Sequence, residues 1–134
     1  MHQLLRLKVA LLTMFAAAGL LAADTIEVKL KARGGQEVLI RSFAEFDRNC
    51  QLVRAQVLTV VDAPANGRFD TRPGEVTIGA NWVGTGTCVG TKLNGIHAYY
   101  IPNAGYTGSD SLSFDIGYVR HRTVRAHVQI DVAQ

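Results

Sequence analysis

Two cysteines, Cys50 and Cys88, are the residues of this 134-residue chain whose type most directly indicates chemistry. In an oxidising compartment an even pair of thiols forms a disulfide, whereas an activated thiol acts as a nucleophile beside a base such as His97. No third residue that would orient this histidine is identifiable. We therefore predict a Cys50–Cys88 disulfide, which closes a loop of about 38 residues and stabilises the fold by roughly 4 kcal/mol.

Metal binding would need several ligands that converge on one point. The histidines after residue 23 are His97, His121 and His127. The last two share strand parity but would lie about 20 Å apart along one strand, which is too far for a shared metal. Three aspartates near expected strand ends are candidates for calcium, although they lack the D-x-D clusters of calcium loops: Asp62, Asp70 and Asp110. We predict no metal site, and a calcium role stays open.

Motifs of the common enzyme classes are missing from the sequence. There is no G-x-S-x-G elbow for a serine hydrolase. The segment 84–87 (GTGT) has the glycines of a phosphate loop but lacks the lysine and the following helix that bind phosphate. We therefore predict that the chain is not an enzyme and uses no cofactor.

Six residues are candidates for contact with a partner: Trp82, Tyr99, Arg120, His121, Arg122 and Arg125. The arginines and the histidine form the densest positive cluster, which could meet an acidic protein, a lipid headgroup or an anionic polysaccharide. Trp82 lies beside a glycine-rich stretch, where aromatic residues often anchor an interface. The competing interpretation is a solvated turn whose charges prevent edge pairing, with the aromatic residues packed in the core.

Residues 1–23 have the features of a secretory signal peptide. Arg6 and Lys8 precede an uncharged apolar run at 9–22, and small residues ending in Ala23 precede Asp24. A membrane span needs about 20 apolar residues, so cleavage is favoured over an anchor. We expect a periplasmic or secreted protein with no transmembrane segment after residue 23.

The charge of the chain changes when this segment is set apart. Residues 1–23 hold two of the 14 basic residues and none of the 11 acidic ones, so the remainder has a formal charge of +1. Nucleic-acid-binding domains carry a clustered basic excess, and we therefore predict no nucleic-acid partner.

Apolar residues after position 23 recur at every second position, which is typical of strands with one buried face. The clearest alternation lies at 111–118 and 124–132, and it predicts an antiparallel hairpin across the core. Other strands are expected at 25–31, 38–40, 53–61, 69–70, 75–78 and 96–100. Many short strands separated by turn signals predict an all-β sandwich of about seven strands, with a closed barrel as the alternative.

Three segments are predicted to lie outside the strands. Ser42 and Glu45 have the spacing of a capping box, which predicts one or two helical turns at 42–49. The glycine-rich residues 81–95 predict a loop, and residues 120–122 predict a turn.

The segment 101–114 (IPNAGYTGSDSLSF) resembles a motif of bacterial extracellular Ig-like, or cadherin-like, domains, and 65–69 (ANGRF) is similar to a hairpin of the same family. The resemblance covers roughly residues 55–132 and implies an Ig-like antiparallel β-sandwich. Five residues of the motif have structural roles in this interpretation: Pro102, Gly105, Tyr106, Gly108 and Asp110. Pro102 ends a strand, the glycines permit positive φ, Tyr106 closes the open end of the sandwich, and Asp110 binds backbone N–H groups.

Together these features predict one Ig-like domain at 24–134 behind a signal peptide at 1–23. The expected function is a binding or adhesion module of the cell envelope, with an unknown protein or glycan as partner. The alternatives are a small secreted inhibitor that presents residues 81–95, and a metal-binding envelope protein. The oligomeric state is left open.

Overall fold

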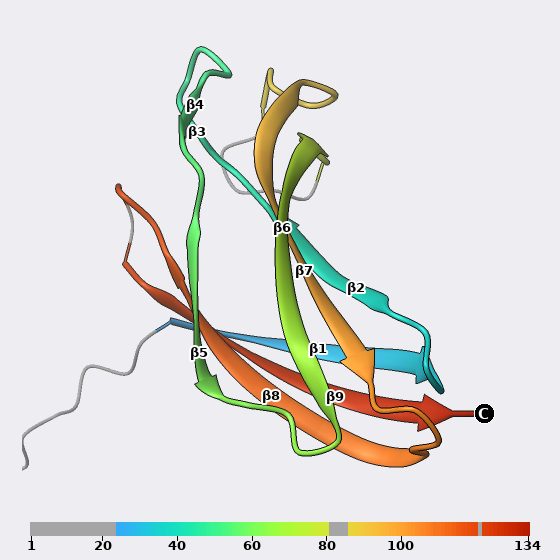
Figure 1. Cartoon of the computed structure of the whole chain (residues 1–134). Helices are drawn as coiled ribbons and strands as arrows, with labels where there is room; N and C mark the ends of the chain where they lie inside the picture. The colour runs from blue at the N-terminus through green and yellow to red at the C-terminus, as the bar shows by residue number, and fades with distance from the viewer. Residues whose placement is uncertain (1–23, 81–85, 121) are drawn as a thin grey trace, which may run out of the picture.

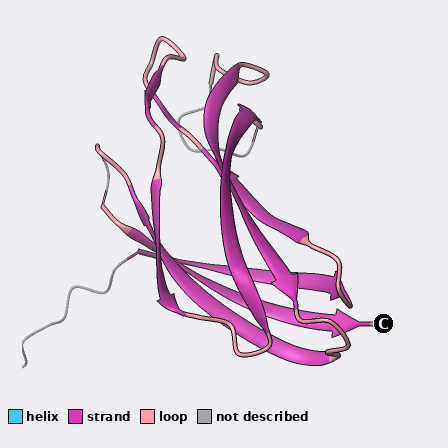
Figure 2. Cartoon of the chain, in the orientation of Figure 1, coloured by secondary structure: helices cyan, strands magenta, loops and turns pink. Residues whose placement is uncertain are grey.

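The computed structural model describes residues 24–80, 86–120 and 122–134, and in these residues it contains strands and no helix (Figures 1 and 2). A four-stranded sheet with the order β1-β9-β8-β5 packs against a three-stranded sheet with the order β2-β7-β6, and β3 pairs with β4 alone. The strands are β1 (Asp24–Arg33), β2 (Val38–Phe43), β3 (Glu45–Phe46), β4 (Leu52–Arg54), β5 (Val57–Asp62), β6 (Gly67–Thr77), β7 (Lys92–Pro102), β8 (Gly108–Gly117) and β9 (Val124–Ala133). The predicted all-β sandwich is confirmed, with nine strands in the described residues rather than about seven.

The core is built by the alternation that the sequence displays. Leu112, Phe114 and Ile116 of β8 and the alternate residues of β9 are buried, and they face Ala98 and Tyr100 of β7. The antiparallel register of β8 and β9 confirms the predicted hairpin. Because side chains of a strand alternate between its two faces, the residues between these apolar ones line the outer face of the four-stranded sheet.

β1 adds a parallel partner to β9 at one edge of this sheet, where Figure 1 shows the two strands side by side. Ile26, Val28 and Leu30 pack against the core, as the alternation predicts. Their neighbours Lys29 and Lys31 are exposed, so this edge of the sheet is charged. Charges of this kind discourage a further strand from pairing there.

The helical turn predicted at 42–49 is wrong. The segment is strand and turn, because Ser42, Phe43 and Glu45 contact distant parts of the chain and Asp47 binds the N–H groups of the turn that follows. Phe43 is buried in the core, and the Ser42 hydroxyl bonds to His97 Nδ1 at 2.7 Å. The buried Glu45 carboxylate accepts the backbone N–H groups of residues 119 and 120. The capping-box spacing therefore serves long-range contacts.

Two further boundaries differ from the prediction. Residues 92–95 of the expected loop belong to β7, where they pair with β6, and residues 81–85 lie outside the described residues. The two weak strands expected at 69–70 and 75–78 are one continuous strand, β6, that runs through Pro73. Proline is tolerated there because β6 lies at a sheet edge, where a missing N–H breaks no second ladder.

The segment 101–114 runs from the end of β7 through a turn into β8. β7 ends at Pro102, and Gly105 and Gly108 have φ of 79° and 125°. Tyr106 is partly buried against the core, and its hydroxyl donates to the carbonyl oxygen of Ser109. These contacts make the segment a compact crossover between the two sheets.

The predicted disulfide is present between Cys50 and Cys88, with a Cα–Cα distance of 5.4 Å. It joins the turn of the β3-β4 hairpin to the turn that precedes β7. Cys88 is buried, so the bridge fixes one end of the sandwich from inside. Both cysteines are in the disulfide, so Cys88 has no free thiol that could act as a nucleophile.

Candidate binding surfaces

Three of the predicted features lie outside the described residues: the signal peptide at 1–23, Trp82 and His121. Arg120 and Arg122 are exposed in the connection between β8 and β9. Arg125 differs from them, because it lies on β9 and forms two hydrogen bonds to Asp115 at 2.8 and 3.0 Å. These bonds hold the pKa of Asp115 below its ordinary value. Arg125 of the expected positive cluster is therefore paired with a carboxylate.

Tyr99 lies at the centre of the outer face of the three-stranded sheet. Its neighbours in register are Asp70 on β6 and Leu39 on β2. Leu39 is 44% exposed although it is a large apolar residue. The guanidinium of Arg72 lies over the Tyr99 ring, 4.4 Å from the ring centre. A cation–π contact of this kind is worth about 0.5–1 kcal/mol at an exposed site.

Two carboxylates hold Arg72 in this position. Glu37 binds both terminal nitrogens of the guanidinium, and Asp70 accepts a hydrogen bond from Nε at 3.0 Å. Hydrogen bonding to Arg72 lowers the pKa of Glu37, and the two carboxylates together raise the pKa of Arg72. Exposed ion pairs contribute little stability individually. The main effect of this arrangement is therefore to fix the side chains of Arg72 and Tyr99 in one position on an open surface.

His97 borders this surface, but both of its ring nitrogens are used. Nε2 lies 3.1 Å from the carbonyl oxygen of Glu75, and Nδ1 lies 2.7 Å from the Ser42 hydroxyl. Because a carbonyl only accepts, Nε2 donates to the Glu75 carbonyl oxygen, and Nδ1 shares a hydrogen bond with the Ser42 hydroxyl. His97 is therefore a bridge between strands rather than a base or a metal ligand.

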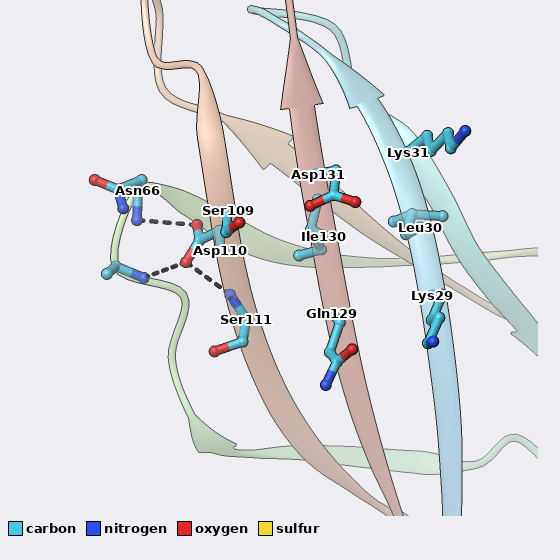
Figure 3. A pocket seen from close by; sticks show the side chains of 11 residues that line it. Lys29, Leu30, Lys31, Asn66, Ser109, Asp110, Ser111, Gln129, Ile130 and Asp131 are labelled. Carbon is cyan, nitrogen blue, oxygen red and sulfur yellow. Dashed lines mark hydrogen bonds between the residues drawn. The ribbon is translucent and has the colours of Figure 1, made fainter.

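The outer face of the four-stranded sheet contains a hollow with a volume of about 670 Å³. Figure 3 shows side chains from three neighbouring strands, β1, β9 and β8, around it. The polar residues that line it include Lys29, Lys31, Ser109, Ser111, Gln129 and Asp131. None of its described lining residues is aromatic, so it has no ring on which a sugar could stack. The hollow is open, and we treat it as a solvated face.

Each of the three aspartates considered for calcium is bound to a different partner. Asp62 accepts the Ser113 hydroxyl, Asp70 binds Arg72, and Asp110 binds backbone N–H groups. In the part of the chain that the structure describes, no three histidine, cysteine, aspartate or glutamate residues form a cluster suited to a metal ion. None of the described segments forms a helix that could span a membrane.

Comparison with known proteins found no matching protein-family model and no matching curated protein.

The sequence analysis named Tyr99 as a candidate contact residue but missed the arginine and the carboxylates around it. A signal was present, because Arg68, Asp70 and Arg72 alternate along β6 as outward residues do. This alternation was hidden by the interruption expected at Pro73, which divided β6 into two short pieces.

Proposed function

We propose that the chain is an exported, non-catalytic binding module of the bacterial extracellular Ig-like type. In this proposal it contacts a protein of the cell envelope through the Tyr99 face, which we define as Leu39, Asp70, Arg72 and Tyr99 with Glu37 at its border. The observation that carries the proposal is the Arg72–Tyr99 stack, fixed by two carboxylates on an open sheet face. Arginine and tyrosine are enriched among the residues that dominate binding energy at protein interfaces.

The order of these side chains favours binding. Association costs free energy when flexible side chains are immobilised, and a long arginine is among the most costly. Arg72 is already held by Glu37 and Asp70. Leu39 adds exposed apolar area beside the ring. The face thus combines an apolar part with fixed charged groups of both signs.

A protein partner fits this face better than a glycan does. A sugar ring binds an aromatic residue by stacking on its face, and one face of Tyr99 is occupied by the guanidinium of Arg72. A protein surface can instead pack against Leu39 and bond to the outer edges of the guanidinium and the carboxylates. Export is supported by the signal-like residues 1–23 and by the disulfide, which persists in oxidising compartments.

The test begins with residues 24–134 as bait for envelope proteins of the source cell, with cross-linking and mass spectrometry to identify what is captured. The recurrent protein is then purified and its affinity is measured by calorimetry. Tyr99→Ala should weaken binding at least tenfold, which is the range expected for a dominant interface residue. Tyr99→Phe keeps the ring and the arginine contact, so it should retain most of the affinity.

Gln129→Ala is the matched control, because Gln129 is exposed on the outer face of the opposite sheet. It should bind as the wild type does. Thermal unfolding of each variant establishes that the fold is intact. The proposal fails if Tyr99→Ala and Arg72→Ala bind the partner with unchanged affinity, or if the bait retains only glycans.

A further inference from the structure

β5 is the second edge of the four-stranded sheet, opposite the charged edge at β1. Within the described residues it pairs with β8 alone. Figure 1 shows it at the border of the sheet, below β4 and in line with it. One side of its backbone therefore presents N–H and C=O groups that no described strand satisfies, and such an edge is a template for a further strand.

The side chains of β5 are uncharged up to Asp62 at its end, and most of them are exposed. Val57, Val60 and Val61 are 57%, 42% and 41% exposed. Val60 is opposite Phe114, which is fully buried, so Val60 is on the side of the sheet that faces the core. It is nevertheless exposed, because β8 is the only strand of the described residues with which β5 makes extensive contacts. The sandwich is thus incompletely covered at this edge.

From these observations we infer that β5 pairs antiparallel with β5 of a second copy of the chain, which joins two four-stranded sheets into one. The charges at the two ends of β5 indicate that the strand paired with its free edge comes from a second copy of the chain. Arg54 precedes β5 and Asp62 ends it, and both are exposed with no charge between them. A two-fold axis beside Leu58 brings Arg54 of each copy near Asp62 of the other. A parallel pair of β5 strands would set like charges side by side, which is unfavourable. An antiparallel pair sets opposite charges side by side, which is favourable.

β1 is less suited to this pairing. It carries charged side chains along its length, including Glu27, Lys29 and Lys31, and such charges discourage a further strand from pairing there. β5 carries a charge only at its end, at Asp62. The inference does not depend on the Tyr99 face, which belongs to the other sheet.

The test is sedimentation of oxidised residues 24–134 over a range of concentrations. One short strand pair is a small interface, so we expect a reversible dimer with a dissociation constant on the order of 10–100 µM. Val57→Lys should weaken the dimer at least tenfold, because it places a charge on the pairing edge. Val60→Lys should also weaken the dimer at least tenfold. Two variants are used so that the test remains valid if one of the substitutions unfolds the protein. Val89→Lys is the matched control, since Val89 is 52% exposed and lies in the turn before β7, which belongs to the other sheet.

Two measurements decide whether β5 itself forms the contact. Hydrogen exchange of the β5 amides should slow at high protein concentration and should not do so in Val57→Lys. Arg54→Glu should weaken the dimer, and Arg54→Glu with Asp62→Lys should recover it. A protein that remains monomeric at about 500 µM overturns the inference. So does a dimer that both lysine variants leave intact, or protection of the β5 amides that arises only with a different protein.

Discussion

Asp110 connects three segments of the sandwich through one carboxylate, and its replacement should be among the most damaging polar substitutions in the domain. The side chain is 9% exposed. Oδ1 accepts the N–H groups of Ala65 and Ser111 at 3.0 and 2.9 Å. Oδ2 accepts the N–H of Asn66 at 3.0 Å and the hydroxyl of Tyr100 at 2.7 Å. The turn before β6, the start of β8 and the end of β7 are therefore held together.

The expected magnitude follows from these four bonds. Asp110→Ala leaves the fully buried Tyr100 hydroxyl with only a long contact to the Asn66 carbonyl, and an unsatisfied buried group costs about 1–3 kcal/mol. The three backbone N–H groups are partly accessible to water, so each contributes about 0.5–1 kcal/mol. We expect a loss of about 2.5–6 kcal/mol in the free energy of unfolding. Asp110→Asn keeps the shape and one acceptor oxygen, and it should lose about half as much.

The contribution of Asp110 to the free energy of unfolding should decrease as the pH falls. Burial raises the pKa of Asp110, but hydrogen bonds from Tyr100, Ser111, Asn66 and Ala65 outweigh burial and hold the pKa below its ordinary value. A carboxyl whose folded pKa is lower than its unfolded value of about 3.9 stabilises the fold above that value. The contribution disappears as the pH falls through the folded pKa. The difference between wild type and Asp110→Asn should therefore be largest at neutral pH and shrink below about pH 4.

Urea unfolding followed by far-ultraviolet circular dichroism, with the disulfide intact, measures these differences at several pH values. Asp131→Asn is the control, because Asp131 is exposed on β9 and its replacement should change stability by less than about 0.5 kcal/mol. Carboxyls elsewhere titrate in both proteins and cancel in the difference. The reasoning is refuted if Asp110→Ala costs less than about 1 kcal/mol. It is also refuted if the gap between wild type and Asp110→Asn is the same at acid and neutral pH.

Two further substitutions test the packing and the crosslink. Replacing Cys50 and Cys88 together by alanine should lower the free energy of unfolding by up to about 4 kcal/mol, which urea titration of the double variant measures against the oxidised wild type. Gly95→Ala should cost about 2–3 kcal/mol, because its new methyl group would collide with the Phe43 carbonyl oxygen, whereas Gly86→Ala has open space and should be nearly neutral in the same titration.

The strands were predictable where one face of a segment is buried and the other is exposed to solvent. β8 and β9 show this most clearly, since Leu112, Phe114, Val128 and Ile130 alternate with polar residues and are all buried. The parallel pairing of β1 with β9 was not predictable. Alternation identifies a strand and its buried face, but a local pattern does not choose which distant strand becomes its neighbour.

The candidate surface was predictable only in part, for the same reason. Tyr99 was recognisable as a large side chain on the outward parity of its strand, but Arg72 and Glu37 reach it through strand pairing and a turn. Glu45 shows how a local pattern can mislead. Its spacing from Ser42 is correct for a helix cap, yet its carboxylate is more strongly satisfied by two N–H groups about 75 residues away.

The two proposed surfaces lie on different sheets, and this has a consequence for how they would act together. Pairing at β5 extends the four-stranded sheet and leaves the three-stranded sheet, with Tyr99 at its centre, uncovered. A two-fold dimer would therefore present two Tyr99 faces at once. If both faces reach sites on one envelope structure, the second contact is intramolecular, and the combined affinity exceeds that of either face without any new contact. A weak dimer would then be favoured on a surface that displays the partner repeatedly, where the local concentration of the protein is high, and would separate in dilute solution.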